Sequence, residues 1–123
     1  MTRASAVVAM DTACEPAVAR LSERAWNHVR FVNASAADLL QQIGTADLVV
    51  MVATAGADAP AAAAIGRSCS ERRATTTALV VGGSSAPDEA LSHTLAQLRP
   101  WSLMIVVARD DDYIEGVLTA LRV

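Results

Sequence analysis

The chain has 123 residues, of which 53% are hydrophobic, and a formal net charge of −3. This length predicts one domain, residues 1–123, with a buried core, and the apolar content excludes a disordered chain. The ten arginines do not outnumber the 13 acidic residues, which argues against a nucleic-acid partner. No apolar run reaches the ~18 residues of a membrane span, and the amino terminus is a poor secretory signal. We therefore expect a cytoplasmic protein with no membrane partner.

The sequence contains no lysine. A Walker-type phosphate loop, Schiff-base chemistry and the lysine of phosphoaspartate receivers are therefore excluded. The two cysteines, Cys14 and Cys69, are too few and too far apart for a metal knuckle or a disulfide framework. His28 and His93 have no acidic or sulfur neighbour at metal-site spacing, so we assign neither a metal site nor a catalytic residue.

Apolar segments predict strands at residues 5–10, 29–32, 47–53, 75–81 and 101–108. The third and fourth of these are continuously apolar rather than alternating, which is typical of strands buried on both faces of a parallel sheet. Each pair of strands is separated by a segment with helical spacing and short polar links. This alternation predicts a Rossmann-like three-layer α/β/α sandwich with a five-stranded, mostly parallel sheet.

The predicted helices start and stop at recognisable residues. Pro16 suits the first turn of a helix whose apolar face ends at Trp26, and Ser35 is the expected cap of the second helix. Pro60 opens the third helix, and Pro100 ends the fourth. The acidic run at residues 110–112 is expected at the start of a fifth helix, where acids complement the helix dipole.

Several segments resemble the nucleotide-binding domain of the FtsZ/tubulin family. Residues 44–56, GTADLVVMVATAG, resemble the stretch that leads into the glycine-rich signature loop of that family. Residues 29–38, VRFVNASAAD, are similar to the strand and the Asn/Asp segment after its first helix. Residues 98–110 are similar to the strand that ends in an Asn-Asp pair. The resemblance implies a nucleotide-binding fold over most of the chain.

The glycines that contact nucleotide in that family are mostly missing. Residues 11–15 read DTACE where the family has consecutive glycines, and Gly56 alone remains in the shortened signature loop. Carboxylates at Asp11, Glu15 and Asp58 would repel a triphosphate unless a divalent cation intervened. The resemblance therefore implies a degenerate, truncated core that no longer hydrolyses GTP, with GTP or GDP and Mg²⁺ as candidate cofactors.

Parallel α/β sheets bind ligands beyond the carboxyl ends of their strands, so the site is expected in the loops there. The sequence Gly82-Gly83-Ser84 before a helix offers amides and a hydroxyl to an anion. We expect a non-catalytic binding or assembly module that takes a small anionic ligand or nucleotide. The predicted ligand-binding residues are Asp11, Thr12, Cys14, Thr54, Gly56, Asp58, Gly82, Gly83 and Ser84.

The alternative is a small enzyme that uses the same loops for phosphoryl hydrolysis. Cys14 and Arg20 have the Cys-x5-Arg spacing of cysteine phosphatases, although residues 15–19 lack the glycines of a phosphate cradle and Leu21 replaces the usual hydroxyl. Asp11, Glu15 and Asp58 are the residues of a metal-carboxylate version. A homodimer through Trp26, Trp101 or the apolar helix faces is a further expectation.

Overall fold

Five parallel strands form one sheet in the computed structural model, which describes residues 4–24, 26, 28–82, 86–108 and 113–121. The order across the sheet is β2-β1-β3-β4-β5, and every neighbouring pair is parallel. The predicted α/β architecture is confirmed, and the sheet is parallel throughout. The strands are β1 (Ser5–Ala9), β2 (Val29–Asn33), β3 (Leu48–Thr54), β4 (Thr75–Val81) and β5 (Met104–Val107).

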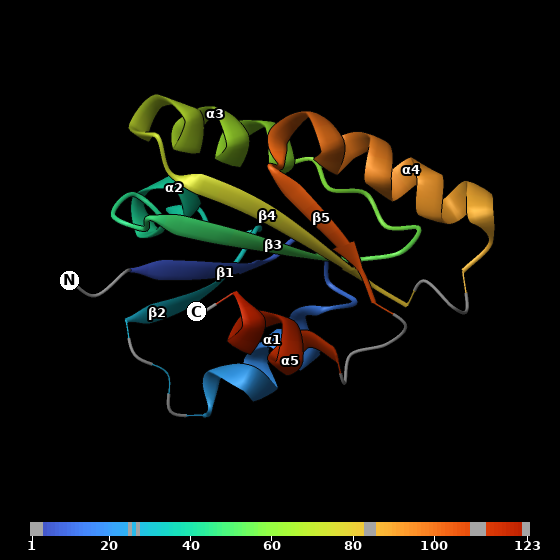
Figure 1. Ribbon diagram of the computed structural model, residues 1–123, viewed down its shortest axis with the longest axis horizontal. Coiled ribbons are helices and arrows are strands. Elements are labelled where there is room, and N and C mark those ends of the chain that lie inside the picture. The colour runs from blue at the N-terminus through green and yellow to red at the C-terminus, as the bar shows by residue number, and fades with distance from the viewer. Residues whose placement is uncertain (1–3, 25, 27, 83–85, 109–112, 122–123) are drawn as a thin grey trace.

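Helices cover both faces of the sheet (Figure 1). One layer contains α1 (Glu15–Ser22) and α5 (Tyr113–Ala120). The other contains α2 (Leu39–Gln42), α3 (Ala62–Arg72) and α4 (Asp88–Leu98), and the 3-10 turn η1 (Arg99–Trp101) follows α4. Within the described ranges, no helix is long and apolar enough to cross a membrane.

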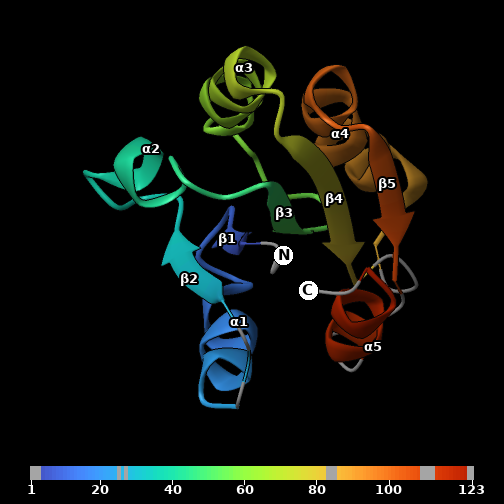
Figure 2. The ribbon, with the colours of Figure 1, turned by 60° about the vertical axis from the view of Figure 1, so that its left-hand side comes forward.

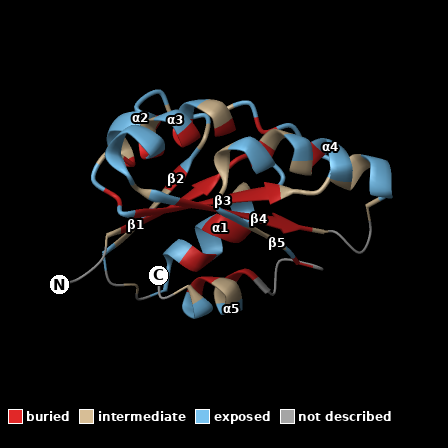
Figure 3. Cartoon of the chain, turned by 45° about the horizontal axis from the view of Figure 1, so that its top comes forward, coloured by how far each residue is buried: buried red, intermediate tan, exposed pale blue. Residues whose placement is uncertain are grey.

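The sheet divides the interior into two hydrophobic clusters. Alternate residues of β3 point into them: Met51 belongs to the cluster beneath α2, α3 and α4, and Val50 and Val52 belong to the cluster beneath α1 and α5. Because both faces of β3 and β4 are covered, their apolar sequences do not alternate with polar residues. Figure 3 shows these central strands buried between exposed helix surfaces.

The helix boundaries differ from several predictions. Trp26 lies beyond the end of α1, and its indole N–H donates to the carbonyl of Leu21 at 2.8 Å. Ser35 lies in a turn rather than at a helix cap, since α2 is one turn long and starts at Leu39. Trp101 lies in η1, so β5 starts three residues later than predicted. The predicted acidic helix start at residues 110–112 falls outside the described residues.

The strand order places a switch point between β1 and β3. The chain leaves β1 towards β2 on one side of the sheet and continues from β3 towards β4 on the other. Loops that leave neighbouring strands in opposite directions open a crevice at the carboxyl edge, which is where doubly wound α/β proteins bind ligands. The expected site residues Asp11 and Thr54 lie there: Asp11 follows β1, and Thr54 is the last residue of β3.

Candidate functional site

The Asp11 carboxylate joins the loops after β1 and β3 at the switch point. One oxygen, Oδ2, accepts a hydrogen bond from the backbone N–H of Thr54 at 2.8 Å. The other, Oδ1, accepts from the Thr54 hydroxyl and from the backbone N–H of Cys14, each at 3.0 Å. The structure therefore brings three of the predicted residues together, with the carboxylate already engaged in bonds within the chain.

The Cys14 side chain is buried beneath this loop. Its thiol lies 3.2 Å from the carbonyl oxygen of Val52 and 3.4 Å from that of Asp11, and it donates to both. Burial is the main cause that raises the pKa of Cys14 to about 11 from 9.0, and the neighbouring Asp11 charge raises it further. A thiolate nucleophile needs a lowered pKa and access to the substrate. The structure provides Cys14 with neither.

Two glycines with left-handed backbones follow the central strands β3 and β4. Gly56 has φ = 94° and Gly82 has φ = 80°. The strand ends are held together by the Ala55 N–H, which donates to the carbonyl of Val81 at 2.8 Å. No atom of the described chain lies within 4 Å of where a side chain would begin at Gly82. The Cβ side of Gly82 is therefore clear of the described chain.

Helix α4 holds the loop after β3 in place. The Thr94 hydroxyl accepts from the Gly56 N–H at 2.8 Å and donates to the Ala57 carbonyl at 2.9 Å, and Gln97 accepts from the Ala59 N–H at 2.7 Å. Thr94 is fully buried. The sequence analysis missed it, although a threonine inside the leucine face of α4 was a visible signal of an internal hydrogen bond.

The remaining predicted residues lie around this centre. Thr12 is exposed in the loop after β1, and Asp58 is exposed and contacts the imidazole of His93 on α4. Gly83 and Ser84 lie outside the described residues. In the part of the chain that the structure describes, no group of three or more His, Cys, Asp or Glu side chains is arranged to hold a metal ion.

Acids dominate the carboxyl edge of the sheet, whereas the amino edge has both arginines and the acids Glu23, Asp47 and Glu71. The carboxyl edge has acids in the loops after the strands and at helix starts: Asp11, Glu15, Asp38, Asp58, Asp88 and Glu89. Glu115 at the start of α5 forms an ion pair with Arg24. The described arginines lie in the middle or at the end of helices, or near the start of β2: Arg20, Arg24, Arg30, Arg67, Arg72, Arg73 and Arg99. This distribution complements the helix dipoles. It also gives the carboxyl edge an excess of negative charge.

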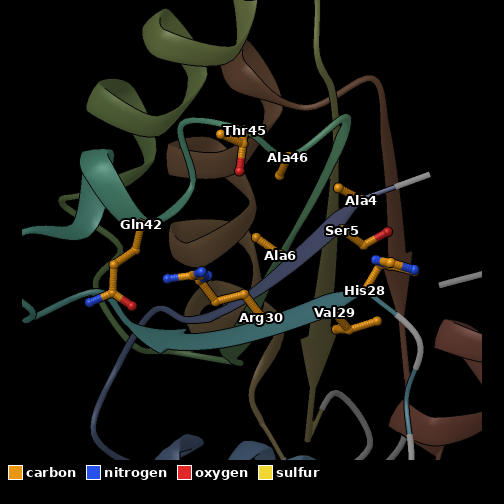
Figure 4. Close-up of a pocket in the computed structure, with 9 residues that line it drawn as sticks. All are labelled: Ala4, Ser5, Ala6, His28, Val29, Arg30, Gln42, Thr45 and Ala46. Atoms are coloured by element: carbon orange, nitrogen blue, oxygen red, sulfur yellow. The ribbon is translucent and has the colours of Figure 1, made fainter. Parts of the chain in front are cut away.

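Two hollows lie at the opposite, amino edge of the sheet. One, of about 260 Å³, lies beside the starts of β1 and β2, with Arg30 and Gln42 on facing walls (Figure 4). The other, of about 460 Å³, lies between the end of α3, the start of β4 and η1. His28 lines the first and Arg73 the second, and both have left-handed backbones, with φ of 57° and 59°. Neither hollow includes a predicted site residue.

The fold is that of a Rossmann-like, doubly wound α/β protein, and at its switch point the Asp11 carboxylate links the loop after β1 to the end of β3 by hydrogen bonds. Comparison with protein-family models gives no match to this chain, and comparison with curated proteins gives no relative.

Proposed function

We propose that this chain is a non-catalytic binding module that takes a small anionic ligand at the carboxyl ends of β3 and β4. One observation supports this most directly. Gly56 and Gly82 have left-handed backbones just after neighbouring central strands, beside the switch point. The Gly56 N–H already donates to Thr94, so the position that a ligand could approach is the Cβ side of Gly82, which is clear of the described chain. Backbone that side chains do not cover is the feature that phosphate-binding loops use to approach an anion.

The ligand class follows from the charges around this opening. Asp11 and Asp58 are the carboxylates nearest in sequence to the ends of β1 and β3, and the described loops that follow β1, β3 and β4 contain no arginine to neutralise phosphate. A nucleotide would therefore bind together with Mg²⁺, which in such sites uses one or two carboxylates and the phosphates themselves. Asp58 is the exposed carboxylate that fits this role.

The resemblance to the FtsZ/tubulin nucleotide-binding core supports a nucleotide as the ligand. The alternation of strands and helices is compatible with that resemblance, in which Gly56 would stand in the signature loop. The missing glycines at residues 11–15 support the loss of hydrolysis. We infer a GDP- or GTP-binding or assembly module without GTPase activity.

Catalysis by the same loops is the less favoured alternative because its candidate groups are engaged in the fold. The Cys14 thiol donates to the Val52 carbonyl, and both oxygens of Asp11 accept hydrogen bonds from the loops that they join. A nucleophile or metal ligand must have a free lone pair directed at the substrate. In a Cys14→Ser variant, thiol-dependent phosphatase activity would disappear, whereas ligand binding should persist.

Isothermal titration tests the binding proposal. GTP, GDP and glucose 6-phosphate are titrated into the protein with Mg²⁺ and again with EDTA, and we expect saturable heat that requires Mg²⁺ for at least one of them. A Gly82→Val variant places a side chain in the open space above β4 and should weaken binding by about tenfold or more. Gly116→Ala, on the exposed side of α5, is the control and should bind as the parent does.

Two results would contradict the proposal. One is the absence of heat across the whole panel with Mg²⁺ present. The other is binding that Gly82→Val leaves unchanged while the variant remains folded by circular dichroism. Release of phosphate from GTP above the buffer rate would contradict the loss of hydrolysis alone.

A further inference from the structure

The edge strand β5 presents an apolar surface to solvent. Its four residues are Met-Ile-Val-Val, with Met104 43% and Val107 46% exposed, and the preceding Leu103 is 79% exposed. Figure 2 shows β5 at the end of the sheet, with α4 over one face and α5 under the other. In the described chain no strand pairs with the outer side of β5. Edge strands of monomeric proteins are normally protected by charge, proline or a bulge.

The opposite edge of the same sheet has that protection. Strand β2 has Arg30 in its second position and ends with Asn33, and both side chains are exposed. Phe31 between them packs against Trp26, with ring centroids 6.1 Å apart. Within the described chain, β5 therefore lacks the protection that β2 has.

The side of α4 that faces β5 has an acid at one end and an arginine at the other, so it is complementary in charge to a second copy that lies antiparallel to it. Asp88, Leu95 and Arg99 recur at helical spacing, so they share one face of the helix and its last turn. The opposite face binds the loop after β3 through His93 and Gln97, which places the Asp88 face on the β5 side. No ion-pair partner for Asp88 or Arg99 is found within the described residues.

We propose that a second copy of this chain docks on β5 by a two-fold axis that pairs the two strands antiparallel. The two sheets then form one continuous sheet, and the unpaired backbone groups of both edges bond to each other. The same axis lays α4 antiparallel to its copy. Asp88 and Arg99 are about 16 Å apart along the helix at about 1.5 Å per residue, so each reaches its opposite charge across the axis, with Leu95 between them.

The area that a stable dimer needs requires the helices to take part. Four strand residues span only about 13 Å, whereas stable interfaces bury about 1,200–2,000 Å² in total. Val117 on α5, in the layer beneath the sheet, is half-buried and packs against the core cluster there, which leaves part of its side chain exposed. The two tryptophans are not part of this surface. Trp26 packs on Phe31, and the Trp101 ring lies 5.3 Å from the guanidinium of Arg67.

Sedimentation equilibrium on the full chain tests the proposal without any ligand. We expect a mass twice the 12.8 kDa of one chain. Val107→Lys should shift the protein towards monomer, since it adds a charge to an exposed edge position. Asp88→Arg and Arg99→Asp should each raise the dimer dissociation constant by about tenfold or more, and the double variant Asp88→Arg/Arg99→Asp should restore it.

Glu89→Arg is the matched control. It reverses a charge at an exposed neighbour of Asp88 that lies on a different side of the helix, and it should leave the dissociation constant unchanged. A parent protein that is monomeric at every concentration would overturn the proposal. So would a dimer that resists both Val107→Lys and Asp88→Arg while circular dichroism shows the variants folded. These outcomes are independent of the nucleotide titration, because β5 lies outside the proposed ligand site.

Discussion

Replacing Asp11 by alanine should destabilise the protein more than any other single change at the carboxyl edge. The substitution removes the acceptor for two backbone N–H groups, those of Cys14 and Thr54, and for the Thr54 hydroxyl. A hydrogen bond to a charged group contributes about 1.5–3 kcal/mol, and bonds that share one carboxylate are not additive. We expect a loss of about 3 kcal/mol from a free energy of unfolding of about 5–15 kcal/mol.

The Asp11→Asn variant divides this loss. The asparagine oxygen can still accept from the Thr54 N–H, but its amide nitrogen cannot accept from the Cys14 N–H. We expect the loss to fall to about 1–2 kcal/mol. Urea unfolding followed by tryptophan fluorescence and circular dichroism measures both variants.

Asp58→Ala is the control for the Asp11 series. The Asp58 side chain is 77% exposed and contacts only His93 among the described residues, so its removal should change the free energy of unfolding by at most about 0.5 kcal/mol. If Asp11→Ala is as stable as Asp58→Ala, the three hydrogen bonds do not hold the two loops together, and the account of the switch point is wrong.

Two further predictions concern glycines and thiols. Gly66→Ala should destabilise the protein by about 1–3 kcal/mol, because the new Cβ would lie 2.5 Å from the Cβ of Trp101. Gly116→Ala adds a Cβ in open space and should stabilise α5 by up to about 1 kcal/mol. Thermal unfolding measures both variants. Cys14 and Cys69 should resist a disulfide reagent at pH 8 until urea is added. Because the pKa of Cys14 is raised to about 11, the unfolded chain loses its proton first, and stability should fall between about pH 9 and pH 11. A thiol count in native buffer equal to that in urea would contradict the burial of the two cysteines, and stability that stays constant up to about pH 11 would contradict the raised pKa of Cys14.

The strongest sequence signals came from the buried strands. The strand at residues 75–81 was predicted with the bounds that the structure has, because it is covered on both faces and residues 78–81 are continuously apolar after three β-branched threonines. Helix starts were predicted less well. Ser35 is a good cap by residue type, but the chain needs only one turn of helix between β2 and β3, and that turn starts at Leu39.

The candidate site was predicted as a set of loops but not as an arrangement. The sequence placed Asp11 and Thr54 after two predicted strands, but it did not show that these strands are neighbours. The two residues are 43 positions apart, so no local pattern indicates that the Asp11 carboxylate accepts from the Thr54 backbone. Cys14 was a motif residue in the sequence. Its burial and raised pKa depend on the packing of β3 beneath it, which no local pattern reports.

The sequence by itself determined the class of fold, because hydrophobic periodicity is a local property that each strand and helix must satisfy before it can be buried. It also determined the absence of lysine chemistry. Only the tertiary structure decided the strand order, the engagement of Asp11 and Cys14 in the fold, and the exposure of β5. Those properties depend on which distant segments become neighbours, and that is set by the packing of the whole chain rather than by any segment alone.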